Sequence, residues 1–316
     1  MTTTHEIILS RIKNETENID FSIPESQRLP AVDALLNRDL LRGGKKLRPY
    51  VCLCFGRMLG VPRAKLERCA KIAEIVHAAS LAHDDVIDEA RVRRGRRTLN
   101  ETTSNPQAVL AGDLLLARST SLCLELGNMD LARDLSETLE ELVAGEWLQL
   151  EARGQMQIEE RHLERVSCAK TASLLRWCLL APLRLSGLGG ETERLSREMA
   201  RLLGLAFQMS DDCVDYSDVS GKQYGKDFSE GLINWVTWTL ISWGKPPQPS
   251  QSHGWAHEDI GLAVKEVQKR AAIKLRMARE CLEQIAGEAT RSGATLDNPA
   301  KENLSELIAA LEKRNF

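Results

Sequence analysis

The chain has 316 residues, of which 43% are apolar and 28% charged, and a formal net charge of −3. That apolar content suffices for a large buried core, and the slightly acidic balance gives no electrostatic drive toward nucleic acid. The eight cysteines are scattered singly apart from Cys52 and Cys54. This pattern excludes a disulfide framework or a paired zinc site, and it favours buried thiols in a reducing cytoplasm.

The amino-terminal residues 1–11 are polar, so we expect no secretory signal, and no segment is apolar for long enough to span a bilayer. Apolar residues recur with helical spacing, and no strand-like alternation is long enough to suggest a sheet. Proline and glycine predict connectors at residues 18–30, 62, 187–190, 245–253 and 293–299. We therefore predict a cytoplasmic, all-α protein with one domain over residues 1–316.

The first polar motif, at residues 43–49, reads G-G-K-K-L-R-P. After a flexible glycine pair, Lys45 and Arg48 stand one helical turn apart. Lysine offers a point charge and arginine a planar fork, so this pair is suited to gripping a diphosphate. A basic run alone is more often solvated surface, so its neighbours in the sequence decide the interpretation.

A helix that is apolar on nearly every side is expected over residues 62–83, as for a helix enclosed by others. It leads directly into Asp84, Asp85 and Asp88. On a helix, the first and last of these stand one turn apart on one face, and the middle one flanks them. The carboxylates would then lie at the polar mouth of an apolar interior.

The same arrangement recurs near residue 210, where the apolar run 202–209 precedes Asp211, Asp212 and Asp215. One such D-D-x-x-D triplet is often a solvated helix face, but two, each ending a buried type of helix, favour a common function. Like charges packed this closely need a counterion, and Mg²⁺ takes hard oxygen ligands while sharing its coordination with substrate phosphates. Two such clusters, facing each other, would hold a diphosphate between them.

Basic side chains accompany both aspartate clusters. They are Arg93 and Arg94 after the first cluster, Lys170 beside Thr171, and Lys222 and Lys226 after the second cluster. Because these residues lie beside acidic clusters and not in one continuous stripe, they argue against nucleic-acid binding.

In their order along the chain, these motifs resemble those of the trans-isoprenyl diphosphate synthases, or polyprenyl synthetases. The resemblance runs from Gly43 to about Gly231, through G-G-K-K-L-R-P, H-D-D-V-I-D, R-R-G, A-G-D, G-E-x-x-Q, K-T, F-Q-M-S-D-D-C-V-D-Y and G-K-Q-Y-G-K-D. An ordered set of this size is far more specific than any single motif. It implies a single large helical bundle of the isoprenoid synthase type with a central apolar cavity.

The resemblance implies a prenyltransferase (EC 2.5.1.-) that condenses isopentenyl diphosphate with an allylic prenyl diphosphate, head to tail. It implies three Mg²⁺ ions, for which Mn²⁺ could substitute, and small-molecule prenyl diphosphates as substrates. It also implies a homodimer formed by helices that flank the first motif, where residues 109–126 offer a broad apolar surface. No stable membrane insertion is expected.

Family positions also assign roles to individual residues. The implied metal ligands are Asp84, Asp88 and Asp211, with Asp85, Asp212 and Asp215 in supporting or direct roles. Arg93, Lys170 and Lys222 would hold the allylic diphosphate, whereas Lys45, Arg48, His77 and Arg94 would bind the isopentenyl diphosphate. Thr171 and Gln208 would lie near the carbocation that forms.

The chemistry follows from the charges involved. Breaking an allylic carbon–oxygen bond releases a diphosphate anion, so metal ions and guanidinium groups that meet the developing charge lower the barrier. The carbocation must be kept from water, which an apolar pocket below the aspartates achieves. No His or Glu is clearly placed to take the final proton, and the departing diphosphate is the family's expected base.

Product length is addressed by the residues one turn below the first cluster. Ala79 and Ser80 are small there, whereas relatives that stop at fifteen carbons carry large aromatics at these places. Val76, one turn further down, is not aromatic either. Since a helical turn and an isoprene unit are both about 5 Å long, we expect an open path and a product longer than fifteen carbons. Trp147 is a candidate for the pocket floor, although a core tryptophan is the more frequent alternative.

The chain departs from the family pattern after Gly231, where a lysine that contacts the allylic diphosphate is usual and this chain has Leu232. Lys226 could compensate for the lost charge. The nearby tryptophans are also atypical, and core or dimer packing is their expected role; they are Trp235, Trp238, Trp243 and Trp255.

Two other classes stay open. A class I terpene cyclase shares the all-helical architecture and one aspartate motif, but it needs no isopentenyl site, and its second metal motif is usually not an aspartate triplet. A non-catalytic partner subunit normally loses an aspartate cluster, and here only Leu232 favours that class.

Overall fold

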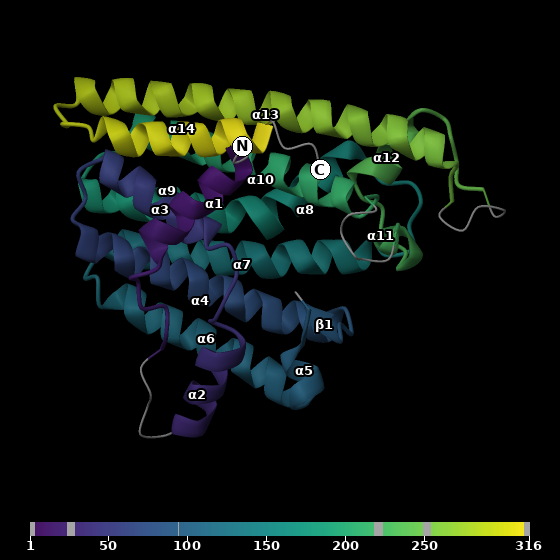
Figure 1. Ribbon diagram of the computed structural model, residues 1–316, viewed down its shortest axis with the longest axis horizontal. Helices are drawn as coiled ribbons and strands as arrows, with labels where there is room; N and C mark the ends of the chain where they lie inside the picture. Colours follow the sequence, from purple (N-terminus) through teal and green to yellow (C-terminus); the bar gives the residue numbers. More distant parts are fainter. Residues whose placement is uncertain (1–3, 24–28, 94, 218–223, 249–253, 313–316) are drawn as a thin grey trace. The chain divides into compact units, whose positions relative to one another are not determined.

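The structure is a computed structural model that describes residues 4–23, 29–93, 95–217, 224–248 and 254–312. These residues are almost entirely helical, as predicted (Figure 1). In chain order, the elements are α1 (Thr4–Thr16), α2 (Pro30–Asp39), α3 (Leu47–Met58), α4 (Arg63–Ile87), β1 (Val92–Arg93), β2 (Arg96–Arg97), α5 (Leu99–Thr102), α6 (Asn105–Leu124), α7 (Met129–Glu151), α8 (Glu160–Ser167), the π-helical turn η1 (Cys168–Ala172), α9 (Ser173–Ser186), α10 (Glu191–Val214), α11 (Lys226–Ser229), α12 (Trp235–Ser242), α13 (His257–Arg291) and α14 (Asn298–Glu312).

The chain forms two compact units. Unit 1 comprises Met1–Ser136, Trp177–Gly189 and Gly293–Lys301, and unit 2 comprises Glu137–Arg176, Gly190–Ser292 and Glu302–Phe316. The single domain expected over residues 1–316 stays a prediction. The predicted connectors, where described, fall between helices, except that Pro30 begins α2 and Asn298 and Pro299 begin α14.

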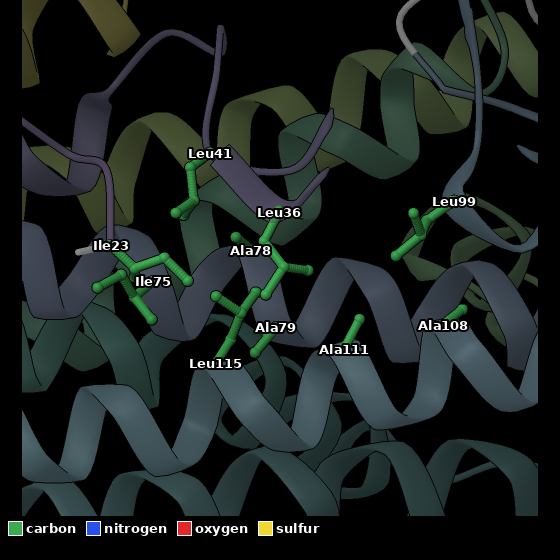
Figure 2. Close-up of a cluster of buried hydrophobic side chains, with 10 residues drawn as sticks. All are labelled: Ile23, Leu36, Leu41, Ile75, Ala78, Ala79, Leu99, Ala108, Ala111 and Leu115. Carbon is green, nitrogen blue, oxygen red and sulfur yellow. The ribbon is translucent and has the colours of Figure 1, made fainter. Parts of the chain in front are cut away.

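The core of unit 1 is built around α4, which packs against α3 and α6. In Figure 2, Ile75, Ala78 and Ala79 of α4 lie close to Leu36 of α2 and Leu115 of α6, and all five are buried. Alanine side chains at such contacts are small, and they therefore let two helices pack closely against each other.

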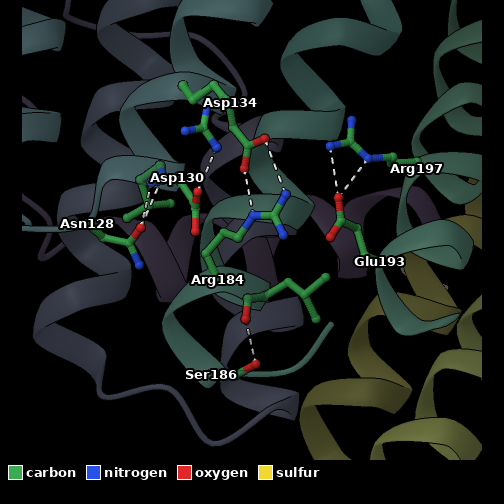
Figure 3. Close-up of polar contacts among 10 residues, drawn as sticks. Asn128, Asp130, Asp134, Arg184, Ser186, Glu193 and Arg197 are labelled. Atoms are coloured by element: carbon green, nitrogen blue, oxygen red, sulfur yellow. Dashed lines mark hydrogen bonds and ion pairs between the residues drawn. The ribbon is translucent and has the colours of Figure 1, made fainter. Parts of the chain in front are cut away.

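Polar contacts fix the ends of the unit 1 helices. Asn128 precedes α7, and its Oδ1 accepts hydrogen bonds from the backbone N–H groups of Asp130 and Leu131, which satisfies donors that a helix start leaves open. Further along, the buried Asp134 accepts a hydrogen bond of 3.0 Å from Nε of Arg184 (Figure 3). This contact ties α9 to α7.

In unit 2, α10 and α13 lie side by side over many residues (Figure 1). The turn η1 packs against α10 at Gly204, where an added Cβ would stand 2.3 Å from Cβ of Ala172. Only glycine therefore permits this approach. All eight cysteines are free, and seven are buried, which confirms the expected buried thiols. Within the described ranges, no helix is both long and apolar enough to cross a membrane.

Candidate active site

The first aspartate cluster forms the last turn of α4. Asp84 and Asp88 are half-buried, and Asp88 caps the helix by donating its backbone N–H to the Asp84 carbonyl at 2.8 Å. The C-terminus of a helix carries the negative end of the macrodipole, so carboxylates placed there raise the local negative potential. This end of unit 1 is therefore suited to binding cations.

Asp85 differs from its neighbours because its side chain is buried against an arginine. Nε of Arg93, in β1, donates to Oδ1 of Asp85 at 2.7 Å. The amide of Asn100 donates to the backbone carbonyls of Asp85 and Ala90. The β1–β2 hairpin is thus tied to the end of α4, and Asp85 holds Arg93 next to the cluster. Arg94 lies outside the described residues.

The predicted isopentenyl residues of unit 1 gather where α3 begins. Nη1 of Arg48 lies 3.4 Å from Nε2 of His77, so the structure brings two of them together. Lys46 instead binds the carboxylate of Glu74 at 2.8 Å, whereas Lys45 is exposed. Lys46 therefore anchors the turn to α4.

The chain-length residues face different surroundings. Val76 and Ala79 are completely buried, and Ala79 belongs to the core cluster of Figure 2. Ser80 is half-buried, and its hydroxyl donates to the His77 carbonyl at 2.9 Å. Trp147 is 64% exposed, so the core alternative is wrong for this chain, whereas its candidacy for the pocket floor stays a prediction.

The second aspartate cluster forms the last turn of α10. Asp211 is exposed, whereas Asp212 and Asp215 are buried. Both oxygens of Asp212 are engaged: Oδ1 accepts from Nε2 of Gln208, and Oδ2 accepts from the backbone N–H of Trp235, each at 2.8 Å. Burial raises the pKa of the Asp212 carboxyl, and the nearby Asp227 carboxylate raises it further.

Lys170 and Thr171 lie in the π-helical turn η1, an irregularity frequent at functional sites. Nζ of Lys170 lies 2.8 Å from Oε1 of Gln149 and 2.5 Å from Oε2 of Glu146. The Thr171 hydroxyl donates to Oε1 of Gln208 at 3.0 Å. Thr171 and Gln208 are therefore linked to Asp212 by successive hydrogen bonds.

A pocket of about 190 Å³ in unit 2 is lined by Lys170, Gln208 and Asp212, and also by Leu232. Leu232 presents an apolar wall there, and Lys226 is paired with Glu230 at 3.2 Å. Lys222 lies outside the described residues. Among the described residues that line the pocket, Lys170 is thus accompanied by Leu232 at the position where the family usually has a second lysine.

The tryptophans mostly pack, as predicted. Trp235 is buried and donates its indole N–H to Oγ of Ser167, and Trp238 donates to the Ile158 carbonyl. The guanidinium of Arg270 lies 5.1 Å and 5.5 Å from the centres of these two rings, within the range of a cation–π contact. Trp243, in contrast, is largely exposed.

The ligand chemistry of both clusters fits a hard divalent cation, because every candidate ligand is a carboxylate oxygen. Within the described residues, no three His, Cys, Asp or Glu side chains converge enough to hold an ion by themselves. An ion bound at either cluster would therefore complete its coordination with water or substrate oxygens, as Mg²⁺ usually does.

The sequence analysis gave no role to Asn234, or to Asp227, the last residue of the G-K-Q-Y-G-K-D motif. Asn234 precedes α12, and its amide donates to the carboxylate of Asp227 at 3.0 Å. The signal was present, since Asn234 is followed three residues later by Thr237 and then by an apolar run, the spacing of a capping box. That the cap would also reach Asp227 depends on tertiary structure.

An all-helical chain with aspartate triplets at two helix ends, each beside basic side chains, defines an enzyme that handles diphosphates with divalent cations. Residues 30–269 match the polyprenyl synthetase family. The chain is 36% identical to the all-trans-nonaprenyl-diphosphate synthase (geranyl-diphosphate specific) of Rhodobacter capsulatus over 230 residues, which cover 71% of this chain and 70% of the relative.

It is also 32% identical to the octaprenyl diphosphate synthase of Escherichia coli over 273 residues, with 85% of this chain and 80% of the relative covered. The fold matches that of a polyprenyl synthase from Caulobacter crescentus, complexed with calcium and isoprenyl diphosphate, with a TM-score of 0.75 at 24% identity, covering 100% of this chain and 99% of the other. The chain belongs to the polyprenyl synthetase family, and the predicted enzyme class, a polyprenyl diphosphate synthase that transfers prenyl groups, is confirmed.

Proposed function

We propose that this chain condenses isopentenyl diphosphate with an allylic prenyl diphosphate and repeats the step to give a trans-polyprenyl diphosphate longer than fifteen carbons. The observation that carries this proposal is the pair of aspartate triplets at the C-termini of α4 and α10. The octaprenyl and nonaprenyl products in the names of two relatives support the length.

In this proposal the accessible carboxylates bind metal and the buried ones orient their surroundings. Asp84, Asp88 and Asp211 coordinate Mg²⁺, of which three ions are expected, with Mn²⁺ able to substitute. Asp85, Asp212 and Asp215 act in support, because burial and hydrogen bonds occupy them. Bound Mg²⁺ supplies positive charge that stabilises the diphosphate leaving group.

The cationic side chains divide between two substrates. Lys170 and Arg93, with Lys222, hold the allylic diphosphate, and Lys45, Arg48, His77 and Arg94 hold the isopentenyl diphosphate. When the allylic carbon–oxygen bond breaks, its electron pair leaves with the diphosphate, and the isopentenyl double bond attacks the carbocation. A proton then leaves the condensed cation to the released diphosphate. Oxygens of Thr171 and Gln208 stabilise positive charge near the reacting carbon.

We also propose a homodimer. On α6, Val109, Leu110 and Leu124 are exposed apolar residues, with Leu110 65% accessible. Large apolar side chains on one exposed helix are typical of a surface that a partner covers. A second copy of the chain would bury them through a two-fold contact.

The test is incubation of the purified chain with Mg²⁺, radiolabelled isopentenyl diphosphate and a series of allylic primers. We expect label in prenyl diphosphates only when both substrates and Mg²⁺ are present, and none with a chelator. A terpene cyclase would consume the primer without isopentenyl diphosphate, and a non-catalytic subunit would leave both substrates unchanged. Either result would refute the proposal.

A further inference from the structure

At the start of α12, two carboxylates of unit 2 meet the positive end of a helix. The backbone N–H of Trp235, the first residue of α12, donates to Asp212, and the side-chain amide of Asn234 donates to Asp227. Helix N-termini stabilise negative charge through free N–H groups and the macrodipole. These two contacts therefore hold two carboxyl groups close together.

The orientation of the Asn234 amide is fixed by its surroundings. Oδ1 accepts from the backbone N–H groups of Val236 and Thr237, both at 3.1 Å, so the oxygen must face α12. Nδ2 consequently faces Asp227 and donates at 3.0 Å. Asn234 is only 6% exposed, so water cannot readily replace either contact.

Asp227 is also hydrogen-bonded to the second aspartate cluster. Its backbone N–H donates to Oδ2 of Asp215 at 3.2 Å, and Asp215 caps α10 one turn after Asp211. Asn234 thus acts at one end of a connected set, and Asp211 and Asp215 lie at the other.

We infer that Asn234 is a positioning residue for metal binding: through Asp227 it holds the aspartates at the end of α10 in the geometry that coordinates the ion. This inference rests on the proposed function of that cluster. Asn234 therefore has two roles: it caps α12, and it donates an amide N–H to Asp227. Serine can fill the first role but not the second.

Asn234→Ser separates the two roles, because serine caps a helix about as well as asparagine but cannot donate an amide N–H to Asp227. We expect thermal unfolding within about 2 °C of wild type and Mn²⁺ binding, measured by electron paramagnetic resonance with inorganic diphosphate present, weakened about tenfold. Ser104→Ala, which removes the cap of α6, is the matched control: it should lower the unfolding temperature and leave Mn²⁺ affinity unchanged.

Unchanged Mn²⁺ affinity in Asn234→Ser would overturn the inference and leave the proposed function intact. Absence of Mn²⁺ binding in the wild-type chain would overturn both. If Asn234→Ser does not fold while Asp227 is intact, the same substitution in the Asp227→Asn background provides a second test of the inference. Because Asn234 acts through Asp227, adding Asn234→Ser to Asp227→Asn should cause little further loss of affinity, and fully additive losses would refute the inference.

Discussion

Individual aspartates in the two triplets have different surroundings, although both triplets have the same D-D-x-x-D spacing. Asp85 and Asp212 are buried and hydrogen-bonded to Arg93, Gln208 and a backbone N–H, whereas Asp84 is half-buried and Asp211 exposed. Metal binding requires carboxylates that a solvated ion can reach. Burial therefore separates the residues that we expect to bind metal from those that orient their neighbours.

Replacing Asp84 or Asp211 with Ala should lower turnover by orders of magnitude while the protein remains folded. The fold should survive because each substitution removes a carboxylate from the unfavourable end of a helix dipole. Turnover and thermal unfolding would be measured side by side, with Asp130→Ala, an exposed aspartate at the start of α7, as control. Activity within tenfold of wild type for both variants would contradict the assignment.

Arg93→Gln should lower the free energy of unfolding by about 1–2 kcal/mol, because it leaves the buried Asp85 carboxylate without its charged donor. Arg97→Gln, on the next strand of the same hairpin, breaks exposed contacts to Glu101, at 3.2 Å to its carbonyl and 3.4 Å to its carboxylate, and should cost less than about 0.5 kcal/mol. Urea denaturation would compare the two variants. Equal losses of unfolding free energy in the two variants would show that the Arg93–Asp85 contact stabilises the fold no more than an exposed contact does.

At the scale of elements, α4 links the first aspartate cluster to the expected path of the product. Small residues on this helix were predicted to line an open path, but the structure separates two of them. Ala79 is enclosed between α4 and α6, near Leu36 and Leu115, while Ser80 keeps part of its surface exposed. A large side chain should therefore have different effects at the two positions.

Ser80→Phe should shorten the product toward fifteen carbons and leave the fold and the Mg²⁺ requirement unchanged, because Ser80 is only half-buried and lies one turn below Asp84. Ala79→Phe should also shorten the product, but at a cost of about 1–3 kcal/mol of stability, since the ring must be forced into a packed core. Chromatography of the products and thermal unfolding test both. An unaltered product distribution in a folded Ser80→Phe variant would place the product path elsewhere.

Much of the helical architecture was predictable because it depends on local pattern. Apolar periodicity predicted α4 and α10, and the aspartates fall in their last turns, with Asp88 and Asp215 as caps. The exposure of Trp147 and the contact from Asn234 to Asp227 were not predictable, because each depends on which elements pack together. A sequence gives a residue's place on a helix, but not what lies opposite that place.

At the scale of the whole molecule, each unit holds one aspartate triplet with basic side chains near it, and both triplets are expected to serve the same reaction. Asp84→Ala and Asp211→Ala should then be strongly non-additive in turnover, as for groups that act together. The double variant would be compared with the two single variants. Losses that multiply in full would indicate independent roles.

The chain should be a dimer at micromolar concentration, as measured by light scattering. Leu110→Glu should shift it toward monomer, because the charge falls on the exposed apolar face of α6. Val92→Glu, at an equally accessible position on the β1–β2 hairpin, should leave the dimer intact. A wild-type monomer, or equal effects of the two substitutions, would argue against this interface.

Product sizing tests the central claim most directly. The purified chain, given Mg²⁺, excess isopentenyl diphosphate and one allylic primer, should yield trans-polyprenyl diphosphates longer than fifteen carbons, and their mass spectra should show a ladder spaced by single isoprene units. Ala79, Ser80 and Val76 place no aromatic ring in the expected path. A product that ends at fifteen carbons or fewer, or a cyclic hydrocarbon formed without isopentenyl diphosphate, would contradict the account.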